Sequence, residues 1–196
     1  MNKLGGLKGG VFVFTVGLLT FVESAFSEDT GVWRTNIEGW DIYIDRTVGN
    51  GCFMTTKFEG GTLLRAQINP VSDQFMFIVG NPSWESINPE KFYDLSVQFG
   101  NRPPWEGEAS VVVFENIKGL VLKVGGDESI GNFTNELMRM TNVKISYRGE
   151  RIANLSLDGS YRAMEEVFTC QAAMNNRAGD SNDPFSSESN SDDPFS

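Results

Sequence analysis

The chain contains no histidine, and this absence excludes several kinds of chemistry. Ser-His-Asp and Cys-His catalysis both use an imidazole to carry the proton. Zinc sites of the usual kinds need histidine or four cysteines, whereas this chain has 2 cysteines. The motifs SxxK, GxSxG and GxxxxGK(S/T) are also missing. We therefore expect no catalytic residues, no metal site and no cofactor, and we predict that the protein is not an enzyme.

Basic residues are scarce: 16 lysines and arginines stand against 26 aspartates and glutamates, which gives a formal net charge of −10. No cluster of lysine and arginine stands out after residue 27. Nucleic-acid binding needs a basic patch that neutralises phosphates, and anionic membrane surfaces attract polybasic segments. We therefore expect no nucleic-acid partner and no attraction to an anionic membrane.

Long apolar runs are missing as well, apart from residues 11–22 (VFVFTVGLLTFV). A membrane-spanning helix needs roughly 20 apolar residues, so this run is too short to be a good anchor. Lysines precede it, and the small residues Ala25 and Ser27 follow it. This order is typical of a secretory signal peptide. We predict that residues 1–27 are a leader that is cleaved before Glu28, with an uncleaved anchor as the alternative.

Removal of the leader would leave a soluble protein without stable membrane insertion, in the periplasm or outside the cell. Residues 28–174 are long enough to form a single globular domain with its own core. Cys52 and Cys170 are the two cysteines, and in an oxidising compartment such a pair indicates a disulfide. Two buried free thiols are the alternative.

The pattern of the domain is mostly that of β-strands. Trp40, Ile42 and Ile44 alternate with polar positions, and similar short runs recur between glycine and proline turns. Tight turns favour antiparallel pairing. We predict a β-sandwich or open barrel with about nine strands. Their expected ranges are 40–45, 52–59, 62–69, 74–79, 92–99, 110–115, 119–124, 143–147 and 151–157.

Two helices are expected to cover an edge or an end of the sheet. Over residues 129–141, apolar side chains recur every three or four positions, with Asp127 or Ser129 as the N-cap. A second helix is predicted over residues 160–173, beginning at Ser160.

Composition changes after residue 174. Residues 175–196 are rich in serine, asparagine and aspartate, and we predict a disordered acidic tail. The tail repeats Asp-Pro-Phe ten residues apart. The repeat is either a bivalent linear motif for a partner or a solubilising sequence that arose by duplication. The motif residues are Asp183, Pro184, Phe185, Asp193, Pro194 and Phe195.

Two tryptophans lie in loops rich in proline and glycine, and each is followed by a glutamate. Trp84 and Glu85 lie in one loop (NPSWES), and Trp105 and Glu106 lie in the other (RPPWEG). Exposed tryptophans beside acids can stack on sugars, so these four residues are a candidate carbohydrate or peptide site. In the alternative interpretation, both tryptophans fold back and cap the core.

Several segments of the domain have a familiar combination. They are GWDIYIDRTVGNGCFM, FEGGTLLRAQINP, FMFIVGNPSWESI, RPPWEGEA and LSLDGSYRAMEEVFTCQ. The combination resembles small secreted proteins of alphaproteobacteria with no assigned activity. The last segment is also distantly similar to the invasion-associated locus B family of β-rich periplasmic or surface proteins linked to host-cell entry. Neither resemblance implies catalytic residues.

We expect a non-enzymatic secreted or periplasmic protein. It would bind an envelope or host protein through its loops, with the tail as a second contact. A carbohydrate-active protein or hydrolase that uses carboxylates and the loop tryptophans is the alternative.

Overall fold

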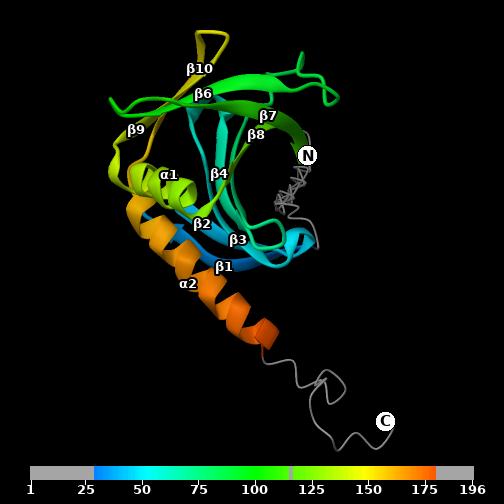
Figure 1. The fold of residues 1–196 in the computed structure, drawn as a ribbon, viewed down its shortest axis with the longest axis vertical. Helices are drawn as coiled ribbons and strands as arrows, with labels where there is room; N and C mark the ends of the chain where they lie inside the picture. The colour runs from blue at the N-terminus through cyan, green and yellow to red at the C-terminus, as the bar shows by residue number, and fades with distance from the viewer. Residues whose placement is uncertain (1–28, 115–116, 180–196) are drawn as a thin grey trace, which may run out of the picture.

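The computed structural model describes residues 29–114 and 117–179 of the 196-residue chain. In this part of the chain, ten strands form one open sheet in the order β1-β2-β3-β4-β5-β8-β7-β6-β9-β10, and every neighbouring pair is antiparallel (Figure 1). The strands are β1 (Thr30–Ile37), β2 (Trp40–Asp45), β3 (Gly51–Lys57), β4 (Leu63–Asn69), β5 (Gln74–Gly80), β6 (Tyr93–Phe99), β7 (Trp105–Phe114), β8 (Ile117–Gly125), β9 (Asn142–Tyr147) and β10 (Glu150–Ser156). The helices are α1 (Asp127–Arg139) and α2 (Ser160–Gly179), and Arg46–Val48 and Glu59–Gly61 are 3-10 turns. The prediction of a mostly antiparallel β fold with two helices is confirmed.

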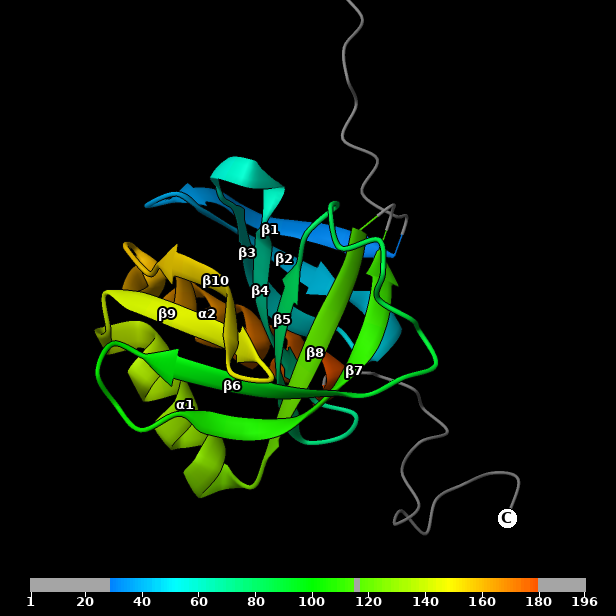
Figure 2. The ribbon, with the colours of Figure 1, turned by 90° about the horizontal axis from the view of Figure 1, so that it is seen from above.

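Strand β7 is the corner at which the sheet turns. Its first half, up to Ala109, pairs with β6, and its second half, from Ser110, pairs with β8. Strands β6 and β9 therefore run across the direction of β4 and β5 (Figure 2). The sheet folds back far enough to enclose a core on one side.

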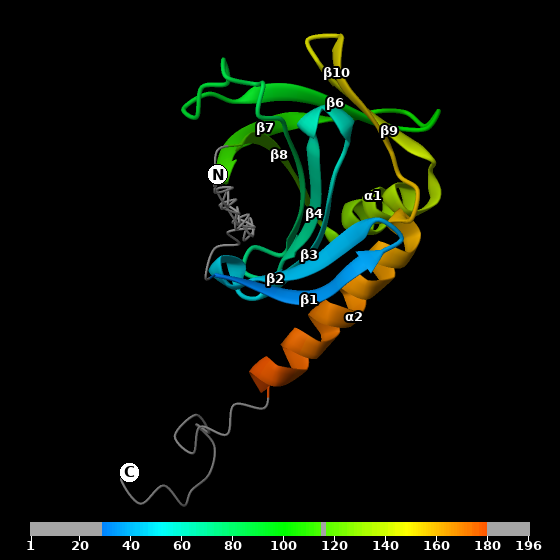
Figure 3. The ribbon, with the colours of Figure 1, turned by 180° about the vertical axis from the view of Figure 1, so that it is seen from behind.

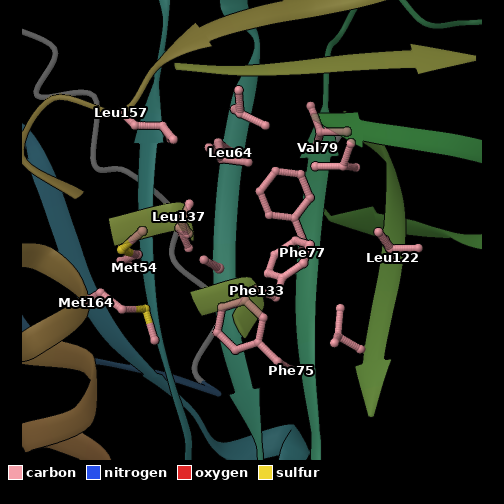
Figure 4. Close-up of a cluster of buried hydrophobic side chains, with 14 of the residues drawn as sticks. Met54, Leu64, Phe75, Phe77, Val79, Leu122, Phe133, Leu137, Leu157 and Met164 are labelled. Carbon is pink, nitrogen blue, oxygen red and sulfur yellow. The ribbon is translucent and has the colours of Figure 1, made fainter. Parts of the chain in front are cut away.

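Helices α1 and α2 close that enclosed side (Figures 1 and 3). Phe133 of α1 is completely buried, and its ring lies 5.0–5.8 Å from the rings of four other aromatic residues. These four are Phe75, Phe77, Phe99 and Trp105. Figure 4 shows how Phe133 and Leu137 reach from α1 toward the strands. The spacing of three to four residues in the sequence therefore correctly predicts that the face of α1 with Phe133 and Leu137 is buried.

Helix α2 is fixed to the sheet by the disulfide between Cys52 and Cys170, whose Cα atoms are 6.1 Å apart. This pairing confirms the prediction. Beside the disulfide, the buried amide of Gln171 accepts a hydrogen bond of 2.9 Å from the backbone N–H of Cys52. The Ser160 hydroxyl donates to the carbonyl of Leu137, which joins the beginning of α2 to α1.

Several details differ from the sequence predictions. The described chain has ten strands instead of about nine, because residues 30–37 form β1. None of the residues of this edge strand is buried, and the strand shifts register twice, so it lacks a clear alternation. Helix α1 begins two residues earlier than expected, at Asp127, and its N-cap is Gly126 rather than Asp127 or Ser129. Helix α2 extends to Gly179, so residues 175–179 of the predicted tail are helical.

Candidate functional site

The side of the sheet that faces away from the helices is the most distinctive surface of the described chain. The helix-free face is the side of β2, β3, β4, β5, β8 and the second half of β7 that faces away from α1 and α2. No described helix lies over it (Figures 1 and 3). Strand register places two rows of side chains on it. One row is Tyr43, Phe53, Gln67, Met76 and Lys123, and the next is Asp41, Thr55, Arg65, Ile78, Val121 and Ser110.

Three polar side chains form a closed network at one end of this face. Arg65 forms an ion pair with Asp45, and its Nε donates a hydrogen bond of 2.9 Å to Oε1 of Gln67. The amide nitrogen of Gln67 donates to Asp45 at 3.2 Å, which closes the triangle. Gln67 is completely buried, so its polar atoms need these partners.

An aromatic pair supports the network. The rings of Tyr43 and Phe53 are stacked with centroids 5.5 Å apart, and the guanidinium carbon of Arg65 lies 3.5 Å from the centroid of Phe53. A cation above an aromatic face is attracted by the ring quadrupole. The guanidinium is therefore held by a ring as well as by a carboxylate.

Burial and neighbouring charges shift the pKa values of Asp45 and Arg65 in opposite directions. Burial by itself raises the pKa of Asp45, but the hydrogen bond from Thr47, the charge of Arg65 and the hydrogen bonds from Gln67 and Arg65 outweigh it. The pKa of Asp45 therefore lies below its ordinary value. Burial lowers the pKa of Arg65, and Asp45 opposes that change. Burial, followed by the charge of Asp41, raises the pKa of Tyr43.

An apolar strip continues from the polar network without a break. Ile78 is opposite Arg65 across β4 and β5, and Met76 is opposite Gln67. Met76, Ile78 and Val121 are 8%, 4% and 5% exposed, with the half-buried side chains of Val112 and Phe114 packed beside them.

A pair of glycines makes room for the end of the strip. Gly80 and Gly119 are opposite each other in β5 and β8. A Cβ atom on Gly119 would lie 3.0 Å from the ring of Phe114, and one on Gly80 would lie 2.9 Å from a methyl of Ile117. The glycines therefore let these two large side chains lie against the sheet.

Trp105, one of the predicted site residues, is part of the wall of the core. Its Nε1 donates a hydrogen bond of 2.9 Å to Glu136, whose other oxygen accepts from Arg102 at 3.2 Å. Its ring lies 5.3 Å from that of Phe133. The indole N–H and the ring of Trp105 therefore both have partners within the protein.

Trp84 also packs against the core, from the loop that follows β5. Asn81 stabilises this loop by donating to the carbonyl of Gly60 and to the hydroxyl of Thr62, at 3.1 and 2.8 Å. Glu85 is exposed, and its backbone carbonyl accepts from Lys118 at the beginning of β8. Trp105 contacts α1, which follows the end of β8. The two tryptophans thus lie toward opposite ends of β8, and the fold does not bring the four predicted residues together.

Glu106 points to the other side of β7 from Trp105 and lines a shallow hollow of about 440 Å³ on the outer side of β6, β7 and β9. Asp94, Glu108 and Arg148 share this hollow. A second hollow, of about 400 Å³, lies between the β1–β2 turn and α2, and its lining includes Glu38, Arg162, Glu165 and Glu166. No group of three or more carboxylate, cysteine or histidine residues within the described ranges is arranged to hold a metal ion.

Comparisons of this chain with protein-family models, curated proteins and solved structures find no match. None of the helices in residues 29–114 and 117–179 is long and apolar enough to span a membrane. The predicted tail motif, with Asp183, Pro184, Phe185, Asp193, Pro194 and Phe195, lies outside the described residues, as does the predicted leader.

Sequence reasoning missed the helix-free face. Leu64 and Ala66 alternate with Arg65 and Gln67 along β4, and such alternation by itself predicts a buried apolar set and an exposed polar set. Leu64 and Ala66 are buried as this pattern predicts, but Gln67 is buried as well. The available signal was the neighbouring strands, where Tyr43 and Phe53 put large aromatic side chains at positions of the polar set. Strands that are buried on both faces carry apolar side chains at successive positions rather than at alternate ones.

Proposed function

We propose that this protein is a non-enzymatic exported binding protein and that the helix-free face is its binding surface. The observation that supports the proposal is the continuity between the Asp45–Arg65–Gln67 network and the apolar strip on a sheet face that no described helix covers. Aromatic and apolar side chains beside a desolvated arginine are the composition of binding hot spots.

The proposed partner is an envelope or host protein that presents an apolar segment. This proposal places the contact on the sheet, whereas the sequence suggested the loops, because Trp84 and Trp105 both pack against the core. The half-buried edges of the strip, Val112 and Phe114, would be the first side chains that the partner meets.

The disulfide is compatible with an oxidising compartment, since such bonds persist in the periplasm and outside the cell. A periplasmic or extracellular location and cleavage of residues 1–27 are part of the proposal. So is the relationship to small secreted alphaproteobacterial proteins and to the invasion-associated locus B family.

Two neighbouring residues of β7 provide a matched test. Val112 belongs to the helix-free face, whereas Val113 points to the other side of the strand and is 55% exposed. The exported protein would be used to capture partners from envelope extract as wild type, Val112→Asp, Phe114→Asp and Val113→Asp. We expect the first two variants to lose the captured proteins and Val113→Asp to keep them. Equal capture by all four proteins, each folded by circular dichroism, would exclude the helix-free face.

The carbohydrate-binding alternative has its own test, since Trp105→Ala removes the ring and leaves β7 in place. We expect glycan-array binding to be absent in the wild type and in this variant. Wild-type binding that Trp84→Ala or Trp105→Ala abolishes would favour the alternative over the sheet face.

A further inference from the structure

A second part of the sheet surface separates its charges into an acidic half and a basic half. The dipolar patch is the outer side of β6, β9, β10 and the first half of β7, and α1 and α2 lie on the other side of these strands (Figures 1 and 2). Its acids are on β6 and β7, and its bases are on β9, on β10 and in the turn between them. They are the acids Asp94, Glu106 and Glu108 and the bases Lys144, Arg148 and Arg151.

Strand register places opposite charges at the two ends of one row of side chains. Glu106 is opposite Ser96, Ser96 is opposite Ser146, and Ser146 is opposite Arg151. Residues opposite each other in antiparallel strands point to the same side of the sheet. The row therefore has an acid at one end, a base at the other end and two small hydroxyl side chains between them.

The charges of the dipolar patch are available to a partner. Among the described residues, none forms an ion pair with any of the six. All of them are exposed except Lys144, which is half-buried. The guanidinium of Arg148 has a ring beside it, 5.1 Å from the centroid of Tyr147, and this contact leaves its charge uncompensated.

We propose that the dipolar patch is the contact surface of a symmetric dimer, in which a second copy of this chain occupies it. A two-fold axis that runs parallel to the strands between β6 and β9 places β9 and β10 of each copy over β6 and β7 of the other. Glu106 then faces Arg151 of the second copy, and symmetry makes this pair twice. The inference goes beyond the proposed function, because Val112 and Phe114 lie on the other half of β7, which pairs with β8.

Charge selects a second copy as the occupant. The chain has a net charge of −10, so two copies repel each other over most of their surfaces. The dipolar patch is neutral, since its three acids and three bases cancel. A surface with one acidic and one basic half is complementary to itself after a two-fold rotation. A uniformly acidic or basic partner would match only half of it.

The shape and size of the patch agree with this arrangement. The β9–β10 hairpin rises above β6 and β7 (Figures 1 and 3), and the hollow of about 440 Å³ lies beside it. The hairpin of one copy can therefore enter the hollow of the other. Four strands with seven residues each cover about 19 by 23 Å, or roughly 900 Å² for two copies. An interface of this size is typical of weak, reversible association.

Charge reversal tests the contact by analytical ultracentrifugation of the exported protein. The wild type should form a concentration-dependent dimer that weakens as salt is raised. Glu106→Arg and Arg151→Glu should each increase the dissociation constant by about tenfold or more, because each puts two like-charged pairs across the axis. An equal mixture of these two variants should recover the wild-type dimer, since both pairs of the heterodimer then have opposite charges. Glu90→Arg is the matched control, with the same change of charge at an exposed loop residue outside the patch.

Three results would overturn the proposal. They are a wild type that stays monomeric up to its highest soluble concentration, a dimer as stable in Glu106→Arg as in Glu90→Arg, and a mixture that associates no better than its two components. Circular dichroism would confirm that each variant is folded. Val112→Asp, which tests the capture of partners, should leave the dimer intact, so this proposal and the proposed function fail separately. A dimer that Val112→Asp dissociates would instead place the second copy on the helix-free face and contradict the role of the dipolar patch.

Discussion

At the scale of single residues, Asp45 ties together the polar end of the helix-free face. Its carboxylate pairs with Arg65 and accepts from Gln67 and Thr47. The side chains of Arg65 and Asp45 are 18% and 13% exposed, so neither charge is well solvated. Removing one charge of such a pair leaves the other without compensation, which costs more than the pair contributes while it is intact.

Asp45→Asn should therefore destabilise the fold, by about 3 kcal/mol at neutral pH, the low end of the range for breaking a buried pair. Asp41→Asn is the matched control, because Asp41 lies on the same face of β2 and accepts a hydrogen bond from the backbone of Asn36, which an amide oxygen can also do. Urea denaturation at pH 7 measures both. A loss for Asp45→Asn no larger than that for Asp41→Asn would contradict the importance of the pair.

The same pair predicts a dependence on pH. The pKa of Asp45 is lower in the folded than in the unfolded chain, where it is about 3.9. Its stabilising contribution is therefore complete above about pH 5 and is lost as the pH falls through the folded pKa. The difference in unfolding free energy between wild type and Asp45→Asn should shrink between pH 6 and pH 3. A difference that is constant or grows over that interval would contradict this assignment.

At the scale of elements, α2 connects the parts of the sheet that are farthest apart in sequence. It packs on β2 and β3 through the disulfide and Gln171, and on α1 through Ser160. Its close approach to the β1–β2 turn depends on Gly159, where a Cβ atom would lie 2.4 Å from the carbonyl of Glu38. Much of the fold therefore depends on how firmly the last helix is fixed to the first hairpin.

The paired change Cys52→Ala and Cys170→Ala tests that attachment. The bridge joins residues 118 positions apart. Chain-entropy models give about 4–5 kcal/mol for closing a loop of that size. We expect a loss of this order in urea denaturation, and reduction of the wild type with dithiothreitol should reproduce it. A loss below about 1 kcal/mol in both experiments would mean that packing alone holds α2.

Local patterns in the sequence were sufficient for some of these elements and not for others. The disulfide followed from having two cysteines, and the buried face of α1 followed from the spacing of Phe133 and Leu137. The pair of Asp45 and Arg65 could not be predicted in this way. It depends on the register of β2, β3 and β4, which turn geometry and tertiary packing determine together. The same limit applies to β7, whose two halves pair with different strands.

At the scale of the whole molecule, the sheet has two edges, and both are irregular in the described chain. Strand β1 shifts register at two points against β2, and β10 shifts once against β9. Bulges at edge strands discourage pairing with another molecule. Together with a net charge of −10, they disfavour growth of the sheet by addition of a second copy. Recognition through the face of the sheet is thus better supported than recognition through its edges.

The boundary of the folded unit can be tested by truncation after Gly179 and after Met174. The shorter chain loses the last five residues of α2, including Asn175, whose side-chain oxygen accepts a hydrogen bond of 3.0 Å from Gln171. Because Gln171 also binds the backbone of Cys52, its orientation matters beside the disulfide. We expect truncation after Gly179 to leave the midpoint of thermal unfolding unchanged. Truncation after Met174 should lower it by about 2–4 °C, which corresponds to the loss of about 1 kcal/mol in a domain of this size. Equal midpoints for the two truncated chains would mean that residues 175–179 add nothing to the fold and that the boundary drawn from composition was adequate.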